Sequence, residues 1–133
     1  ESGIAGNGSI ADDRRRLWSC ITTFESIDTV GFSDDDLAKY NSLKAELYPK
    51  AADAYYTKGK SDFLSKNMTE AKTDLETALK YASNENFVDD IYYYLGQIAE
   101  EKRYASAKKY YNKIISDYPD SNQIGNARNA LEA

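Results

Sequence analysis

The sequence predicts an all-α protein of about seven helices, arranged as antiparallel hairpins that stack on one another. Two observations predict helices. Apolar residues recur at spacings of three and four through most of the chain, and proline, which breaks helices, occurs only at Pro49 and Pro119. A third observation predicts stacking: 37 residues separate Gly59 from Gly96, and small residues recurring at such a period are typical of helical repeats.

The length of the chain fits one domain. It has 133 residues, enough to bury a core of its own. Residues 1–9 are polar and rich in glycine, so we expect a flexible linker or a remnant of cloning there. The chain begins with Glu1, which indicates a processed chain or an excised fragment. We expect residues 10–133 to form the single helical domain.

Three helices are expected in the first half of the chain. The first covers about Ile10–Ile27, and its apolar side carries Leu17, Trp18, Ile21, Phe24 and Ile27. Ser33 is expected to cap the second helix, because the acidic run 34–36 would fill a first turn where the helix dipole favours anions. Pro49 is expected to end that helix and to open the third, which runs to about Ser65.

Four further helices are expected in the second half. Thr69 is expected to cap the fourth, which ends near Ala82. The fifth covers about 88–101, and a very short turn leads to the sixth, about 104–118, which Pro119 stops. Ser121 is expected to cap a seventh, amphipathic helix over 121–133, of the kind that closes the end of a helical stack.

The unit that ends at Pro119 has a distinctive pattern. It has an aromatic residue, Leu-Gly three residues on, a small residue in the second helix, an aromatic residue four later and a final proline. These are Tyr92, Leu95, Gly96, Ala107, Tyr111 and Pro119. The pattern resembles the tetratricopeptide repeat family, whose period is about 34 residues. Ile114 departs from it, since a small residue is usual there, and the turn is one residue short.

The unit before it follows the same pattern more weakly. Its matching residues are Tyr55, Gly59, Ala71, Leu75 and Ala78. Lys58 stands in the leucine position, and Ser83 replaces the final proline. We therefore expect a degenerate repeat at 10–49, repeats at 50–83 and 88–119, and a capping helix at 121–133. The resemblance implies a short right-handed superhelix in which small residues at 59, 71, 96 and 107 let paired helices pack closely.

Composition argues against several kinds of chemistry. Histidine is absent, and the lone Cys20, expected in the core, cannot form an internal disulfide. The net charge of −5 argues against nucleic-acid binding, and no apolar run is long enough to cross a membrane. We read Asp34–Asp36 as a helix cap rather than a cation site, and Arg14–Arg16 as a solvated face. No catalytic, cofactor or metal residues are predicted, and no enzymatic activity.

The resemblance implies that the first helix of each repeat lines a concave groove. By position, the groove residues are Asp53, Tyr56, Lys60 and Phe63 from one repeat and Asp90, Tyr93, Gln97 and Glu100 from the next. Such a mixed aromatic and polar surface suits an extended peptide or a partner helix. Tyr56 and Tyr93 are expected to be the more exposed members of their tyrosine clusters. The alternative is a groove too shallow to bind, in a domain that serves as a spacer.

The leading hypothesis is a non-enzymatic protein-interaction or scaffold module. Two alternatives stay open: a cell-surface glycan-binding module that uses exposed tyrosines, and a structural spacer arm of a larger protein. The ending 118–121, Tyr-Pro-Asp-Ser, resembles bacterial envelope repeat proteins such as accessory factors of outer-membrane assembly and of the Tol–Pal system. That resemblance implies an extracytoplasmic location in a bacterial surface or membrane-anchored protein. The partner and the oligomeric state are not predicted.

Overall fold

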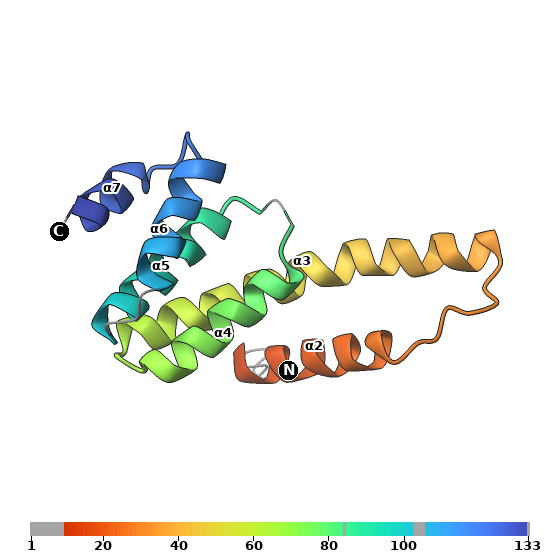
Figure 1. The fold of residues 1–133 in the computed structure, drawn as a ribbon. Helices are drawn as coiled ribbons and strands as arrows, with labels where there is room; N and C mark the ends of the chain where they lie inside the picture. Colours follow the sequence, from red (N-terminus) through yellow and green to blue (C-terminus); the bar gives the residue numbers. More distant parts are fainter. Residues whose placement is uncertain (1–9, 84, 103–105, 133) are drawn as a thin grey trace.

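The computed structural model describes residues 10–83, 85–102 and 106–132, and these segments form six helices (Figure 1). The helices are α2 (Ile10–Glu25), α3 (Asp34–Leu64), α4 (Met68–Tyr81), α5 (Val88–Glu101), α6 (Ser106–Asp117) and α7 (Ile124–Glu132). The predicted all-α class is confirmed, with six helices in place of about seven. The linker expected at 1–9 lies outside the described residues.

The missing helix is explained by α3, which continues without a break through Pro49. The prediction that Pro49 separates two helices is therefore wrong. Proline has no N–H, so the carbonyl of Ala45 loses its partner in the helix, but both residues are exposed and water can bond to that oxygen. Packing then holds the helix together beyond the proline, because Ala51 and Ala52 are fully buried.

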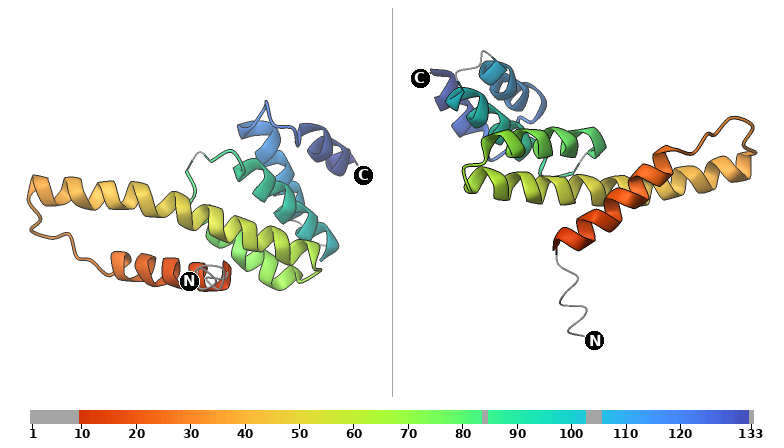
Figure 2. Two further views of the ribbon diagram at one scale, coloured as in Figure 1. Left: turned by 180° about the vertical axis from the view of Figure 1, so that it is seen from behind. Right: turned by 90° about the horizontal axis from the view of Figure 1, so that it is seen from below.

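α2 and the first half of α3 form an arm that projects from the rest of the molecule (Figures 1 and 2). α2 runs back along α3, and the ring of Phe24 stacks on Tyr40 at 4.5 Å between centroids. The predicted cap at the start of α3 is confirmed, since Ser33 Oγ accepts a hydrogen bond of 3.1 Å from the Asp36 amide. Cys20 is exposed, so its predicted place in the core is wrong.

The second half of α3 pairs with α4, and α5 pairs with α6, as two antiparallel hairpins (Figure 2). Small residues allow the close approach that the sequence predicts. A Cβ built on Gly59 would lie 2.7 Å from Leu75 Cγ on α4, and one on Gly96 would lie 2.6 Å from Tyr111 Cε1 on α6. The core of the molecule therefore depends on the lack of side chains at these two crossings.

The turn between α3 and α4 is tight because Lys66 adopts the left-handed conformation, with φ 70°. Its amide bonds to the Phe63 carbonyl, and the Asn67 amide bonds to the Asp62 carbonyl, which is the Schellman arrangement of a helix end. α4 then begins at Met68, so the prediction that Thr69 caps it is wrong.

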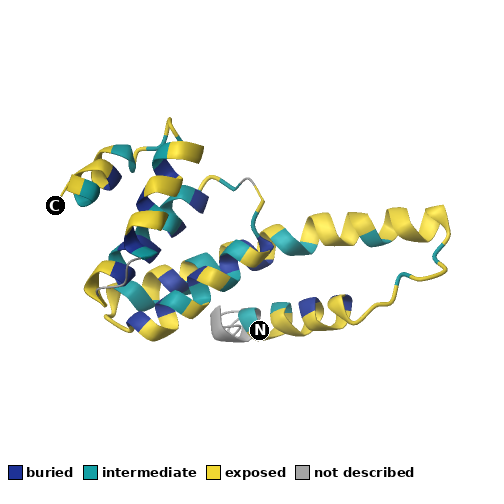
Figure 3. Cartoon of the chain, viewed as in Figure 1, coloured by how far each residue is buried: buried dark blue, intermediate teal, exposed yellow. Residues whose placement is uncertain are grey.

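Burial differs sharply between the arm and the rest of the molecule. Figure 3 shows buried residues along α4, α5 and α6, while the first half of α3 is almost entirely exposed. One core cluster joins the two hairpins through Leu75, Ile91, Leu95 and Ile98, and another joins α6 to α7. Among the described helices, none is long and apolar enough to cross a membrane.

Candidate functional site

The predicted groove residues lie on α3 and α5, whose faces adjoin. The ring of Tyr56 on α3 stacks on Phe87, just before α5, with centroids 4.6 Å apart and planes 2° apart. About two helical turns further on, the ring of Phe63 lies 5.0 Å from that of Tyr94. Because residue numbers rise together along both helices, α3 and α5 run in the same direction, as the first helices of stacked hairpins do.

Exposure divides the eight groove residues into two groups. Asp53, Lys60 and Glu100 are exposed to solvent. The others are half-buried: Tyr56, Phe63, Asp90, Tyr93 and Gln97. We expected Tyr56 and Tyr93 to be more exposed than the tyrosines beside them. In the structure all of these tyrosines are half-buried, so exposure does not distinguish Tyr56 or Tyr93 from its neighbours. The surface is thus a strip of ring edges with charged side chains at its borders.

Tyr56 stays a hydrogen-bond donor at any physiological pH. Burial, followed by the negative charge of Asp90, raises the pKa of its phenol to about 12. A neutral hydroxyl can donate a hydrogen bond as well as accept one. The ring itself contributes apolar contact area, which is why tyrosine is common at binding surfaces.

Two of the predicted residues, Gln97 and Glu100, also hold the second hairpin together. The hydroxyl of Tyr111 on α6 donates to Glu100 Oε2 at 2.8 Å, and Gln97 Nε2 donates to the same hydroxyl oxygen at 2.7 Å. Burial, together with the bond to Glu100, raises the pKa of Tyr111 far above its ordinary value. This network fixes the two side chains in place, so their availability to a partner is limited.

Asp90 on α5 holds the turn that leads into α7. Gln123 Nε2, one residue before α7, donates to Asp90 Oδ1 at 2.9 Å. Next to it, the Ser121 hydroxyl donates to Asp89, and Ser121 Oγ accepts from the Gln123 amide at 2.9 Å. Ser121 therefore stabilises the turn into α7, which itself begins at Ile124. These bonds hold the turn before α7 to the start of α5, while α7 itself packs against α6.

Sequence reasoning missed a charged cluster between α3 and α4. Lys58 Nζ lies 2.7 Å from Asp74 Oδ2 and 3.0 Å from Asp62 Oδ2. Lys58 occupies the position where the repeat pattern has leucine, and Asp74 on α4 compensates its charge. Burial and the neighbouring Asp62 raise the pKa of Asp74, whereas hydrogen bonds from its neighbours outweigh burial and lower the pKa of Asp62. The spacing of four between Lys58 and Asp62 was the available signal.

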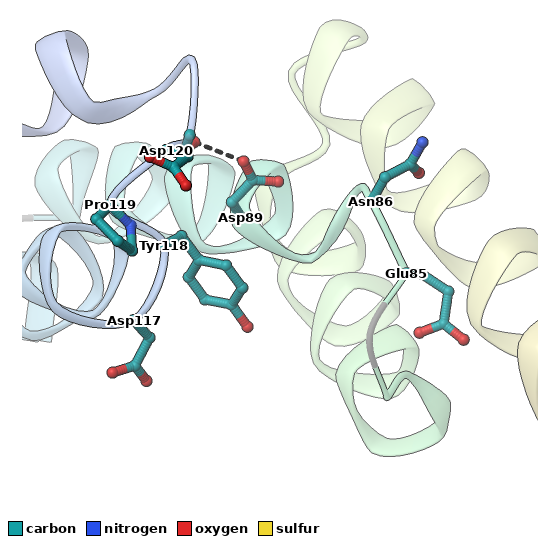
Figure 4. A pocket seen from close by; sticks show the side chains of 8 residues that line it. Glu85, Asn86, Asp89, Asp117, Tyr118, Pro119 and Asp120 are labelled. Carbon is teal, nitrogen blue, oxygen red and sulfur yellow. Dashed lines mark hydrogen bonds between the residues drawn. The ribbon is translucent and has the colours of Figure 1, made fainter.

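A hollow of about 370 Å³ lies where α5 and α6 meet the turn into α7 (Figure 4). It is lined by Glu85, Asn86, Asp89, Asp117, Tyr118, Pro119, Asp120 and Ser121. Asp89 accepts the hydrogen bond that Ser121 donates. Figure 4 marks a hydrogen bond at Asp89 with a dashed line. The carboxylate of Asp117 is paired with Lys113 at 2.5 Å. Among the described residues, no group of three or more side chains is arranged to hold a metal ion.

The tyrosine rings on and around α5 do not form a flat platform. The ring planes of Tyr93 and Tyr94 are 54° apart, and those of Tyr92 and Tyr118 are 40° apart. The rings of Tyr56 and Phe87 are parallel, but they are stacked face to face and do not lie side by side in one plane. A glycan-binding site of the kind considered above requires coplanar rings that face solvent, so these rings give that alternative no support.

This fold defines the class of the protein: it is a helical-repeat protein built from stacked antiparallel hairpins. A model of the tetratricopeptide repeat family matches residues 90–121, which cover α5, α6 and the turn after them. Over these residues the chain is similar to a tetratricopeptide repeat, at the unit where the sequence pattern is clearest. Repeats of this kind generally serve as protein-interaction or scaffold units. No match was found among curated proteins or among solved structures.

Proposed function

We propose that this domain is a non-enzymatic interaction module that binds an extended peptide or a partner helix across α3 and α5. The observation that carries the proposal is the adjoining of Tyr56 and Phe63 with Phe87 and Tyr94, which makes one aromatic strip from two repeats. Ring edges supply apolar contact, and Asp53 and Lys60 at the border supply charge of both signs.

Charge reversal at the exposed border residues tests this proposal without disturbing the core. Lys60→Glu and Asp53→Lys each change an exposed side chain on the proposed face. The matched control is Lys109→Glu, an exposed lysine on α6. A partner isolated with the wild-type domain should bind at least about tenfold more weakly to the border variants, measured by calorimetry. The control should bind like the wild type.

Two results would contradict the proposed face. One is a partner that binds both border variants and the control with equal affinity. The other is a partner that loses affinity only with Lys109→Glu, which would move the site to α6. Circular dichroism on each variant shows whether the helices are intact, so that lost binding is not mistaken for lost folding.

We also propose an extracytoplasmic location in a bacterial surface or membrane-anchored protein. The support is the resemblance of the Tyr118–Ser121 ending and its cap helix to envelope repeat proteins. The test is the accessibility of the native protein to added protease in intact cells and in cells with a permeabilised envelope. Protection in both, with digestion only after lysis of the inner membrane, would rule this location out.

A further inference from the structure

α2 packs against one side of the α3–α4 hairpin, on a patch that we call the α2-binding surface. Ile21, which is only 1% exposed, is the residue of α2 at the centre of this contact. Two alanines with small side chains leave room for Ile21, and the rings of two tyrosines pack against the same cluster. The residues of the α2-binding surface are Ala51, Ala52 and Tyr55 on α3 and Tyr81 on α4.

Few side chains hold α2 in this position. Among the α2 residues whose side chains the structure describes, only Ile21 and Phe24 are buried. By contrast, α4 buries five of its 14 residues and α5 buries six of its 14. Trp18 on α2 and Ile27 just after it stay 49% and 40% exposed. A helix with so few buried contacts opens at a lower free energy than the core of the same protein.

The connection from α2 to α3 allows α2 to move while the hairpins stay packed. It spans residues 26–33, none of which is buried. Its backbone hydrogen bonds include local ones, from the Ile27 amide to the Phe24 carbonyl and from the Phe32 amide to the Thr29 carbonyl. Opening of α2 therefore breaks the contacts of α2 itself and does not require the α3–α4 and α5–α6 hairpins to separate.

Glu25, the last residue of α2, is a polar attachment to both helices of the hairpin. Its Oε1 accepts a hydrogen bond of 3.2 Å from the Tyr81 hydroxyl on α4. Its Oε2 accepts one of 3.3 Å from the Tyr48 hydroxyl on α3 and lies 3.8 Å from Lys80 Nζ. Three donors thus converge on one carboxylate. A carboxylate at the same place on another helix satisfies these donors equally well.

We propose that α2 is a detachable helix, and that the α2-binding surface accepts an amphipathic helix of a partner protein when α2 opens. The contacts of α2 define the chemistry of this partner: apolar side chains at positions i, i+4 and i+7 and a carboxylate at i+8, which share one face of a helix. In α2 these residues are Leu17, Ile21, Phe24 and Glu25. Because α2 has to leave first, the open fraction of α2 sets the apparent affinity.

Hydrogen exchange of the wild-type full chain measures the opening. A helix of 16 residues is marginal in water without its packing, so α2 loses its backbone hydrogen bonds when it detaches. The amides of α2 should exchange at least about 100-fold faster than those of α4 and α5. Equal protection of α2 and α5 would mean that α2 opens only when the whole protein unfolds, which would overturn the proposal.

Glu25→Ala tests the polar attachment. It removes the acceptor of two tyrosine hydroxyls, so the exchange of α2 should rise about tenfold while that of α5 stays unchanged. The matched control is Glu76→Ala, an exposed glutamate on α4, which should change neither helix. Unchanged exchange of α2 in Glu25→Ala would remove the carboxylate from the pattern that the partner helix has to carry, and would contradict the proposal in this form.

A labelled synthetic peptide of residues 10–27 is the probe for a partner helix. In fluorescence anisotropy it should bind about tenfold more tightly to full-length Glu25→Ala than to the wild type, because more of the variant is open. The same peptide with Ile21→Lys is the control and should bind to neither protein. At saturation the wild-type peptide should also speed the exchange of the chain's own α2.

Two results of the peptide experiment would overturn the proposal. One is equal binding, or no binding, of the two peptides to the Glu25→Ala protein. The other is a peptide that binds without releasing α2, since it would then occupy another part of the molecule. Neither result depends on the groove of α3 and α5, because the α2-binding surface is a separate contact.

Discussion

Tyr111 occupies the space that a side chain at position 96 would need. A Cβ built on Gly96 would lie 2.6 Å from Cε1 and 2.8 Å from Cζ of the Tyr111 ring. The ring cannot swing aside easily, because its hydroxyl is bonded to Gln97 and Glu100 and only 1% of the residue is exposed. The close contact of α5 with α6 therefore depends on this pair of residues.

Gly96→Ala should destabilise the protein by about 2–3 kcal/mol, because one of two tightly packed helices has to move. Gly125→Ala is the matched control. It is also a helical glycine, but a Cβ there meets nothing within 4 Å, so it should stabilise the protein by about 0.5 kcal/mol. Urea denaturation of both variants measures the difference. Equal effects at the two positions would show that space at Gly96 is not the constraint.

Lys66→Gly should stabilise the protein by about 0.5–1 kcal/mol. Lys66 is in the left-handed conformation, which glycine adopts without the steric cost that other residues incur. Both amide bonds of the turn, from Lys66 and Asn67, would be kept. Lys66→Ala removes the same charge but keeps a Cβ, so it should give no gain. A similar rise in the unfolding midpoint for both variants would attribute the effect to charge instead.

Stability should fall steeply in alkali, with a measurable share from Tyr56. The folded-state pKa of this phenol is about 12 and its ordinary value is 10.0, so the unfolded chain loses the proton first. The stability that this difference contributes is complete below about pH 10 and is lost as the pH rises through about 12. Burial likewise raises the pKa of Tyr55, Tyr81 and Tyr94, which adds to the slope.

Tyr56→Phe should make the slope of stability against pH shallower between about pH 10 and about pH 12. Denaturant unfolding of variant and wild type at several pH values measures it. The difference in unfolding free energy between variant and wild type at neutral pH measures every other effect of losing the hydroxyl. This difference is subtracted from the differences at higher pH. Identical slopes would show that the Tyr56 phenol ionises equally easily in the folded and unfolded chain.

The sequence pattern was most informative where packing is tightest. Gly59 and Gly96 were identifiable because only a small residue allows two helices to cross so closely, and the structure shows both contacts. The prediction that a helix ends at Pro49 was wrong because it considered only the cost of a proline inside a helix, about 3 kcal/mol. The burial of Ala51 and Ala52 against distant parts of the chain offsets that cost. Such burial cannot be read from the residues next to Pro49 in the sequence.

The candidate site was predictable only in part, for a related reason. Tyr56 and Lys60 are four residues apart, so helical spacing places them on one face of α3. Their positions in the repeat pattern were enough to predict this. Spacing does not indicate that Asp90 bonds to Gln123, because that contact joins residues 33 apart in the sequence. The same holds for Lys58, whose partner Asp74 on α4 becomes visible only once the hairpin is folded.

Glu100 provides the sharpest test of whether a predicted groove residue serves the fold. If its bond with Tyr111 matters for folding, Glu100→Gln and Tyr111→Phe should each destabilise the protein, and the double variant should lose less than the sum. A hydrogen bond to a charged group predicts a coupling of about 1.5–3 kcal/mol, reduced toward about 1 kcal/mol because Glu100 is exposed. Urea denaturation of the four proteins measures this coupling. If the losses of unfolding free energy in the two single variants add up to that of the double variant, the bond between Glu100 and Tyr111 contributes nothing to folding. Recognition of a partner would then be the main role of Glu100.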